Sequence, residues 1–521
     1  MRLAVVWAAA LALAAALAAQ NIPNPGDATS PAPAEPGHAL LGEPHETVNP
    51  ANGSLTIAFS LPLPPGRGGF TPAFTISYSS AGSHPFGSFG NDMANMYAQS
   101  SLFSSDGWSY GAPVLTYTTA DIPLNDGSGM VCTTSSDYMA QMPDGSRQQL
   151  LLSDTGRASG NRPNPVEACD DWIDETASAS LEGWAASTTA LVDSYWRWEP
   201  VTLTSPDGTA LQFPGSGVPE FGALATTMTD RNGNQVAYSV TGGNALPSSP
   251  FALTLTDTLG RVLTTSGFAQ PTDTITVPGM SSPYSVSWSS EPASGTVTVE
   301  GDPNGGPNTC PNTVAALHGG TAVTSITTPS GTYTFSYDPT WGVVDKITYP
   351  NGGYVRYVWG LEAETEPAEL QTWNGSAYQA CYARFDNPVI TDRYVSPDGS
   401  TETEHQSFTY ATTWGTSIYL PWTEKTTTEV DTDSVAGTTR TIAYAYSPGG
   451  QPPPPNSGTF IAGFTPLEST VTTEDGGGNP LRVVTEAWDG PLLPPADQQT
   501  VQNGVNRLRR PRRQHPRPPR E

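Results

Sequence analysis

The chain has 521 residues, and its 52 glycines and 51 prolines amount to roughly one residue in five. This density leaves few stretches long enough for an uninterrupted helix, whereas the abundant Thr, Ser, Val and Tyr suit a pleated, half-buried surface. The composition therefore predicts an all-β fold. The formal net charge of −27 disfavours nucleic acid and anionic membranes as partners.

The N-terminal segments are expected to lie outside the fold. An apolar run from Leu3 to Ala19 contains Ala16-Leu17-Ala18, which fits the small-x-small cleavage rule, so residues 1–19 are predicted to be an export signal. The alternative is a membrane anchor, although the run is short for a bilayer span and no second apolar segment follows it. Residues 20–46 are rich in Pro, Ala, Gly and Asp and are typical of a flexible linker. We therefore expect a secreted or cell-surface protein without a further transmembrane segment.

Two β regions are predicted to follow, over residues 47–240 and 241–490. In the first, Leu55, Ile57 and Phe59 alternate with polar residues, as do Phe74, Ile76 and Tyr78 beyond a Pro-Gly-Arg-Gly-Gly break. Such alternation indicates strands joined by a glycine-rich loop. Turn signals recur at Pro143-Asp144-Gly145, Pro206-Asp207-Gly208, Asn232-Gly233, Pro329-Ser330-Gly331, Pro350-Asn351-Gly352 and Pro397-Asp398-Gly399. Helical spacing occurs at Leu181, Trp184, Leu191 and Tyr195, but Gly183 and a hydroxyl-rich run weaken it.

One hairpin is especially clear in the stretch YDPTWGVVDKITYPNGGYVRYVWG, residues 337–360. Two alternating runs, Val343–Tyr349 and Tyr354–Trp359, flank Pro350-Asn351-Gly352. Asn-Gly adopts the positive backbone angles of a tight hairpin turn, and Pro350 fixes the start of that turn. The distance from Pro329 to Pro350 is about one hairpin, which indicates a tandem repeat.

Several of these motifs resemble the rearrangement-hotspot (RHS) proteins. Tyr337-Asp338, followed by a strand, a Pro-Asn-Gly-Gly turn and an aromatic strand, is similar to their Tyr-Asp (YD) repeat. Asp257–Leu263, Asp230–Asn234 and the strands of Val48–Ser80 resemble further hallmarks of these proteins, so the resemblance extends over about Val48 to Trp488. Two departures stand out. Phe86–Asn91 replaces an expected Gly-x-Gly-Trp element, and Trp341 is inserted before Gly342 in the repeat, where no Arg follows the Gly.

The resemblance implies an extended antiparallel sheet of β-hairpins that spirals into a hollow shell. In relatives such shells enclose a C-terminal toxin, form a chamber in insecticidal toxin complexes, or serve as the adhesion body of teneurins. The regular array is short here, and Gly490-Pro491 follows the last strand-like run, Leu481–Trp488. We therefore expect an N-terminal or truncated portion of such a protein, with an open curved sheet or partial spiral shell. Its exposed C-terminal edge is expected to self-associate or to need a partner strand, and no cargo is enclosed.

No motif predicts catalysis, a cofactor or a metal site. His-Glu-x-x-His and a phosphate-binding loop are both missing from the sequence. The acidic cluster CDDWIDE, Cys169 to Glu175, offers oxygens for calcium, but its spacing matches no calcium loop and a solvated surface loop is favoured. We expect a non-enzymatic structural or binding protein. The alternatives are a carbohydrate-binding surface module and, less favoured, a secreted glycoside-active enzyme.

Aromatic stripes supply the candidate ligand-binding residues. They are Trp196, Trp198, Tyr354, Tyr357 and Trp359. Such rings stack on sugars when they are exposed beside polar groups. Cross-strand packing within a sheet is the alternative, and it is the favoured one.

Four cysteines, Cys132, Cys169, Cys310 and Cys381, permit two disulfides in an exported chain. Local pairing of Cys132 with Cys169 and of Cys310 with Cys381 is preferred among three connectivities, and free buried thiols are the alternative. The last segment, residues 491–521, changes to Arg and Pro: Arg507 to Glu521 alone holds seven Arg and one Glu. This composition predicts a disordered basic tail, with an out-of-frame read-through as the alternative.

Overall fold

The computed structural model describes a subset of the chain in detail. The described residues are 45–61, 63–70, 74–82, 103–123, 131–144, 147–150, 152, 154–159, 177–179, 184–188, 200–214, 222–241, 252–301, 313–317, 319–373, 378–414, 422–449 and 465–486. They form strands, together with two single-turn 3₁₀-helices, and every strand pairing is antiparallel. The predicted export signal, most of the predicted linker and the predicted basic tail lie outside these residues.

The N-terminal sheet has five strands in the order β1-β2-β3-β5-β4. Its elements are β1 (His45–Val48), β2 (Leu55–Ser60), η1 (Arg67–Gly69), β3 (Thr75–Ser79), η2 (Ser80–Gly82), β4 (Ser104–Ser105) and β5 (Trp108–Tyr110). A second five-stranded sheet has the order β14-β6-β7-β8, with β9 paired to β7. It contains β6 (Val114–Pro123), β7 (Val131–Gln141), β8 (Arg147–Leu150), β9 (Asp154–Ser159) and β14 (Ala223–Leu224).

The third and largest sheet has 22 strands. They are β10 (Ala177–Ala179), β11 (Ala185–Thr188), β12 (Val201–Thr204), β13 (Ala210–Phe213), β15 (Thr227–Thr229), β16 (Gln235–Thr241), β17 (Ala252–Asp257), β18 (Val262–Thr265), β19 (Thr272–Thr276), β20 (Tyr284–Ser290), β21 (Thr296–Gly301), β22 (Thr313–Ala316), β23 (Thr321–Thr328), β24 (Gly331–Tyr337), β25 (Val344–Thr348), β26 (Tyr354–Trp373), β27 (Tyr378–Ser396), β28 (Glu404–Thr413), β29 (Glu424–Asp433), β30 (Thr438–Gly449), β31 (Thr465–Asp475) and β32 (Pro480–Thr485).

Most neighbours in the large sheet are consecutive in sequence, as expected for a chain of hairpins. There are two exceptions. β13 pairs with β15, because β14 belongs to the second sheet. At the hairpin of β21 and β22, β20 pairs with β23, while β21 pairs with the far end of β27. The order begins at β10 and ends at β32, and these two strands do not pair with each other. The prediction of an all-β fold with an open antiparallel sheet is therefore confirmed.

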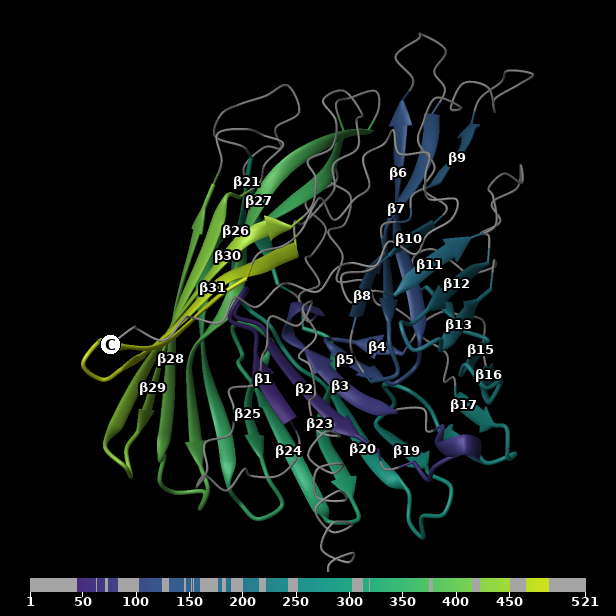
Figure 1. The fold of residues 1–521 in the computed structure, drawn as a ribbon, viewed down its shortest axis with the longest axis horizontal. Coiled ribbons are helices and arrows are strands. Elements are labelled where there is room, and N and C mark those ends of the chain that lie inside the picture. The colour runs from purple at the N-terminus through teal and green to yellow at the C-terminus, as the bar shows by residue number, and fades with distance from the viewer. Residues whose placement is uncertain are drawn as a thin grey trace, which may run out of the picture.

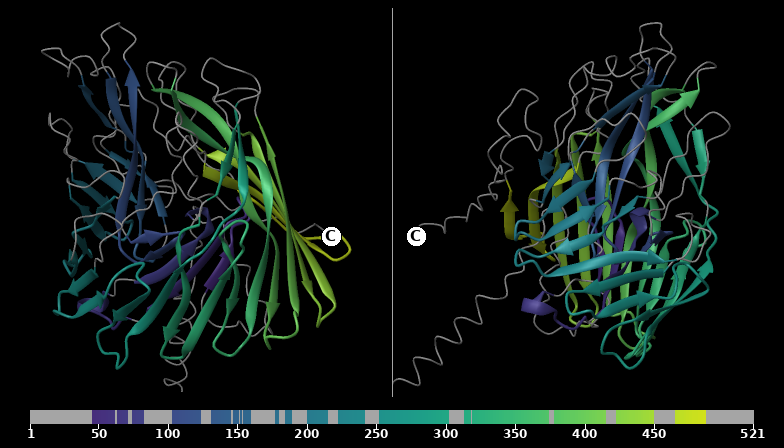
Figure 2. Two further views of the ribbon diagram at one scale, coloured as in Figure 1. Left: turned by 180° about the vertical axis from the view of Figure 1, so that it is seen from behind. Right: turned by 90° about the vertical axis from the view of Figure 1, so that its right-hand side faces the viewer.

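The large sheet is bent, and the N-terminal sheet lies against one of its faces. Strands β1 to β3 run in front of β20, β23 and β24 in Figure 1 and behind them in the reverse view of Figure 2. One hydrophobic core joins the two sheets. In it the ring centres of Phe59 and Tyr333 lie 5.1 Å apart in an edge-to-face contact, and those of Trp108 and Phe335 lie 4.8 Å apart. The inner face is thus filled by the first part of the same chain.

One turn geometry recurs along the rim of the large sheet. In Asp230–Asn234 and Asp257–Arg261, the backbone amide of the first residue donates to the carbonyl of the fifth. The amide of the fourth residue, a glycine, donates to the carbonyl of the first. Ser205–Thr209, Tyr349–Gly353 and Asp475–Asn479 repeat the pattern. The fourth residue always has a positive φ, for example +73° at Gly260, which explains why glycine stands there. The motifs that resemble RHS proteins at Asp230 and Asp257 are therefore hairpin turns.

The Tyr-Asp pair opens a longer version of this turn. Here the amide of Asp338 donates to the carbonyl of Val343, five residues later in the chain. The amide of Gly342 donates to the carbonyl of Asp338 at 2.7 Å. The extra residue is accounted for by the inserted Trp341. Asp338 Oδ1 accepts the amides of Thr340 and Trp341, while the hydroxyl of Tyr337 accepts from Trp108 Nε1 at 2.8 Å. The tyrosine therefore ties the repeat to the N-terminal sheet, and the aspartate shapes the turn.

One local expectation needs correction. Strand β1 begins at His45, inside the segment 20–46 predicted as linker, because Glu46 is held by a buried partner described below. The helical spacing around Trp184, already disfavoured from the sequence, produces no helix over Ala185–Thr188, which forms β11 and pairs with β12. Pairing with β12 outweighs the helix propensity of Ala185 and Ala186 there.

Candidate functional site

The hairpin of β1 and β2 reaches across the inner face of the sheet. Its turn is tightened by Asn49, whose backbone carbonyl accepts the amide of Gly53 at 2.8 Å. The carbonyl of Gly53 accepts the amide of Ile390 at 3.0 Å, so the turn pairs directly with β27. A side chain at Gly53 would lie 2.5 Å from Val389 Cβ, and its φ is +65°. Only glycine fits this approach without strain.

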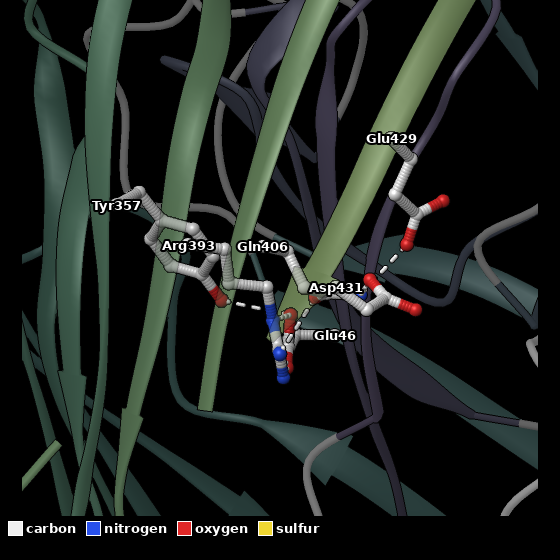
Figure 3. A network of polar contacts seen from close by, with 6 residues as sticks. All are labelled: Glu46, Tyr357, Arg393, Gln406, Glu429 and Asp431. Atoms are coloured by element: carbon white, nitrogen blue, oxygen red, sulfur yellow. Dashed lines mark hydrogen bonds and ion pairs between the residues drawn. The ribbon is translucent and has the colours of Figure 1, made fainter. Parts of the chain in front are cut away.

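The carboxylate of Glu46 is the centre of the polar contacts beneath this hairpin. It forms an ion pair with Arg393 of β27, and Tyr357 of β26 donates to its Oε2 over 3.0 Å (Figure 3). The side chains of Glu46 and Arg393 are only 8% and 17% exposed. Burial opposes the charge of Arg393, but the Glu46 carboxylate outweighs it and holds the pKa of the guanidinium above its usual value.

Cross-strand register places further polar residues in one row with Arg393. Tyr357, Arg393, Gln406, Asp431 and Arg440 stand opposite one another on β26 to β30. Arg393 Nη1 donates to Gln406 Oε1 at 2.8 Å, and Gln406 Nε2 donates to Asp431 Oδ1 at 2.9 Å. Arg440 closes the row with an ion pair to Asp431. The opposite charges of Asp431 and Arg440, directly opposite on neighbouring strands, are a favourable arrangement in a sheet.

Glu429 extends this network toward the core. Its Oε1 accepts from Gln406 Nε2 at 2.7 Å, and its Oε2 accepts from the Tyr444 hydroxyl at 3.0 Å. Burial, followed by the nearby charge of Asp431, raises the pKa of Glu429 to about 8. This shift favours the neutral form of Glu429. In that form the two arginines balance Glu46 and Asp431, and the network carries no net charge.

A carboxylic acid with a pKa near neutrality beside a carboxylate has the acid–base character used in hydrolysis. Access argues against such a use here, because Glu429 is only 7% exposed and the β1–β2 hairpin covers its strand at Pro50, whose carbonyl accepts from Thr427. The geometry is that of a buried structural clamp, in which each member bonds another member. Its chemistry is to hold β1 against β26 to β30.

A second polar location lies at the rim. There the glycine-rich loop after β2 meets two of the Asp-x-x-Gly turns, and a hollow of about 380 Å³ is lined by Arg67, Gly68, Asn232, Gly233, Asn234 and Thr258. Gly68 approaches Asn234 so closely that a Cβ there would lie 3.1 Å from its amide nitrogen. Three motifs that are far apart in sequence therefore support one another in the fold. The lining offers one guanidinium and amide groups to a small polar molecule.

The predicted aromatic residues divide into three groups. Tyr357 and Trp359 are 3% and 7% exposed and point into the core, so neither presents a ring to a sugar. Their placement corrects the ligand-binding interpretation for these two in favour of packing, because alternate residues of β26 face the N-terminal sheet. Tyr354 is half-buried, with Lys346 Nζ 4.1 Å from its ring centre. Trp196 and Trp198 lie outside the described residues.

The remaining predicted sites are not described by the structure. Cys169, Cys310 and the acidic cluster from Cys169 to Glu175 lie outside the described residues. Cys132 and Cys381 lie in β7 and β27, but their side chains lie outside the described part as well. Across the described ranges, His, Cys, Asp and Glu nowhere gather in a group of three or more that could hold a metal ion. In the same ranges, no helix has the length and apolar character needed to cross a bilayer.

The members of the buried network do not stand out in the sequence. Its patterns place Glu46 in a linker and give no prominence to Arg393, Gln406, Glu429 and Asp431. A usable signal is the run EKTTTEVDTD of β29, in which Lys425, Thr427 and Glu429 alternate with period two. Charged residues at strand period, on a face that turns out to be buried, are the mark of an internal polar row.

Comparisons with known proteins give distant matches. No protein-family model matches the chain. No curated protein is similar to it either. In the crystal structure of TcdB2-TccC3, a chain matches at 12% identity and a TM-score of 0.21, over 78% of this chain and 17% of that one. In the pore of the Photorhabdus luminescens Tc holotoxin with mutated TccC3, a chain matches at 9% identity and a TM-score of 0.26, over 82% of this chain and 26% of that one. This chain thus spans about a quarter or less of those chains.

Proposed function

We propose that the chain is a secreted or cell-surface protein of the RHS/YD-repeat type with a non-enzymatic, structural role as a segment of a shell. The observation that carries the proposal is the filling of the inner face by the chain's own N-terminal sheet. A bent sheet whose concave side is occupied, and whose buried charges are balanced, is built to be a stable wall. Export is supported by the apolar segment of residues 1–19.

The polar residues of the network support the same role. A catalytic acid must come within hydrogen-bond reach of a substrate, whereas Glu429 is enclosed by Gln406 and Tyr444. Burying this many polar groups costs free energy unless all are paired, so such a network specifies how β1 docks. The network therefore fits a scaffold that must fold in one way.

The test is to incubate the purified full-length chain with a panel of soluble polysaccharides and to measure reducing ends and binding heat. We expect neither. Reducing ends that disappear in Glu429→Gln, but persist in the matched control Glu402→Gln, would instead support a glycoside-active enzyme. Glu402 is a suitable control because its carboxylate is accessible and pairs with Arg356 at 2.9 Å. Binding heat without turnover that is lost in Tyr354→Ala would support a carbohydrate-binding module.

Localisation is tested separately by fractionating cells that express the chain. We expect the mature protein, cut near Ala18 or Ala19, in the medium or on the cell surface. Intact chain that is retained in the cytoplasm would contradict the proposed export.

A further inference from the structure

The large sheet ends in a strand whose outer edge faces solvent. Strand β32 pairs with β31 and with no other strand among the described residues. Leu481 and Val483 are 66% and 51% exposed, although both are apolar and typical of strands. An unprotected edge of this kind is a template for pairing with another strand. The hairpin of β31 and β32 is the yellow end of the sheet in Figure 1.

The hydrogen bonds to β31 show which backbone groups point outward. The amide of Glu486 donates to the carbonyl of Ser469 at 2.9 Å, so the backbone of Glu486 faces β31. Because direction alternates along a strand, the backbones of Val484 and Arg482 also face β31. Those of Val483 and Thr485 therefore face outward, where an added strand must bond.

We infer that a second copy of the chain pairs with this edge, β32 against β32, antiparallel about a two-fold axis at Val484. In this register Val483 exchanges both backbone hydrogen bonds with Thr485 of the other copy, and the outward groups are the ones used. Val484 meets its own copy, and Arg482 stands opposite Glu486 twice. Both of the last two pairs fall at non-hydrogen-bonded positions, where side chains approach most closely.

Charge selects this register among the alternatives that the outward backbone groups allow. Moving the axis to Arg482 would oppose two arginines, and moving it to Glu486 would oppose two glutamates. An axis at Val483 would place Arg482 opposite Val484 and leave the charge uncompensated. Only the axis at Val484 pairs both arginines with both glutamates.

The isolated chain also carries an unfavourable charge interaction at this edge. Burial, and then repulsion from Glu486, raises the pKa of Glu468 to about 7. Glu468 lies on β31, one residue from the Ser469 that pairs with Glu486. A guanidinium brought opposite Glu486 by the second copy relieves this repulsion. The small contact area of one short strand predicts a weak, reversible dimer.

The test is sedimentation velocity on the full-length chain over a series of concentrations. We expect a monomer–dimer equilibrium in which Arg482→Glu and Glu486→Arg each weaken association by roughly tenfold or more, and the double exchange restores it. Glu424→Arg changes the charge as much as Glu486→Arg does, at an exposed position of β29, and should leave association unchanged.

A second variant separates pairing from folding. Val483→Pro removes an amide that points away from β31, so it should abolish the dimer while the melting temperature of the monomer is kept. A chain that stays monomeric at every concentration would overturn the inference. The register would be overturned by a dimer whose association the charge reversals leave unchanged, or by one that the double exchange fails to restore. Pairing of this edge with a different protein, and never with a second copy, would overturn the choice of partner. None of these outcomes bears on the proposed structural role.

Discussion

Carboxyl groups at the turns of the large sheet and two carboxyl groups on its strands behave in opposite ways. At the rim, Asp230 and Asp475 accept hydrogen bonds from the side chains of Asn234 and Asn479 and from turn amides, which lowers the pKa of each aspartate. On the strands, burial raises the pKa of Glu429 to about 8 and that of the half-buried Glu468 to about 7. The same sheet thus favours the charged form of the acids at these turns and the neutral form of these two acids on its strands, and the supply of N–H donors relative to burial decides between them.

The largest expected effect that tests this contrast is the pH dependence of the unfolding free energy. A raised pKa contributes stability that is complete below the usual value of about 4.3 and is lost as the pH rises toward the folded value. Glu429 and Glu468, together with Asp106 and Asp273, raised to about 7 and about 6, all act in this direction. Unfolding free energy measured by urea titration should therefore fall between about pH 5 and pH 8.

The rim aspartates produce the opposite slope at lower pH. Their lowered pKa contributes stability that is present above about pH 4 and is lost as the pH falls below it. Glu429→Gln should flatten the fall toward pH 8 and leave the acid limb intact. A profile that Glu429→Gln leaves unchanged would show that the interior acid is ionised throughout.

The next largest effect tests whether burial makes the Glu46–Arg393 pair matter. Arg393→Met leaves a buried carboxylate without its partner, and we expect a loss of about 3–5 kcal/mol in unfolding free energy. Arg356→Met is the matched control, since its pair with Glu402 is 37% and 29% exposed and should be worth about 0–1 kcal/mol. Adding Glu46→Gln to Arg393→Met should recover part of the loss. Equal losses of unfolding free energy in Arg393→Met and Arg356→Met would show that burial does not make the first ion pair more important than the second.

The smallest effect compares one glycine from each region. Gly260 turns at the rim with φ +73°, and a Cβ added there would meet no neighbouring atom within 4 Å, so Gly260→Ala should cost only the backbone term of about 1–2 kcal/mol. Gly53→Ala meets Val389 as well and should cost more in the same chemical denaturation experiment. Equal costs would mean that the β1–β2 turn yields to an added methyl group.

Local features of this fold could be predicted from sequence because short-range chemistry determines them. Pro350-Asn351-Gly352 forms the expected hairpin turn: Gly352 has a φ of +89° and donates to Tyr349 at 2.9 Å. The alternation of Tyr354 to Trp359 likewise marks strand β26. Open, all-β architecture followed from many such hairpins in a row.

The buried site could not be predicted in the same way, for two physical reasons. Its inner face is polar on β29, where Lys425, Thr427 and Glu429 are buried and Val430 is only half-buried, so hydrophobic alternation selects the wrong face. Its decisive contact joins Glu46 to a residue 347 positions away. No local pattern encodes such a pairing.

That separation has a consequence for the time course of synthesis. The β1–β2 hairpin is made early, but its acceptor on β27 follows 347 residues later. At about 5–20 residues per second, the ribosome needs roughly 20–70 s to supply it. For most of this interval the apolar residues of the hairpin have no final place to dock, because Tyr333 and Phe335, which pack on Phe59, are also made late. A nascent chain of this design is therefore exposed to proteases and to premature pairing for most of its translation, and a holding chaperone that binds its first strands would raise the yield of folded protein.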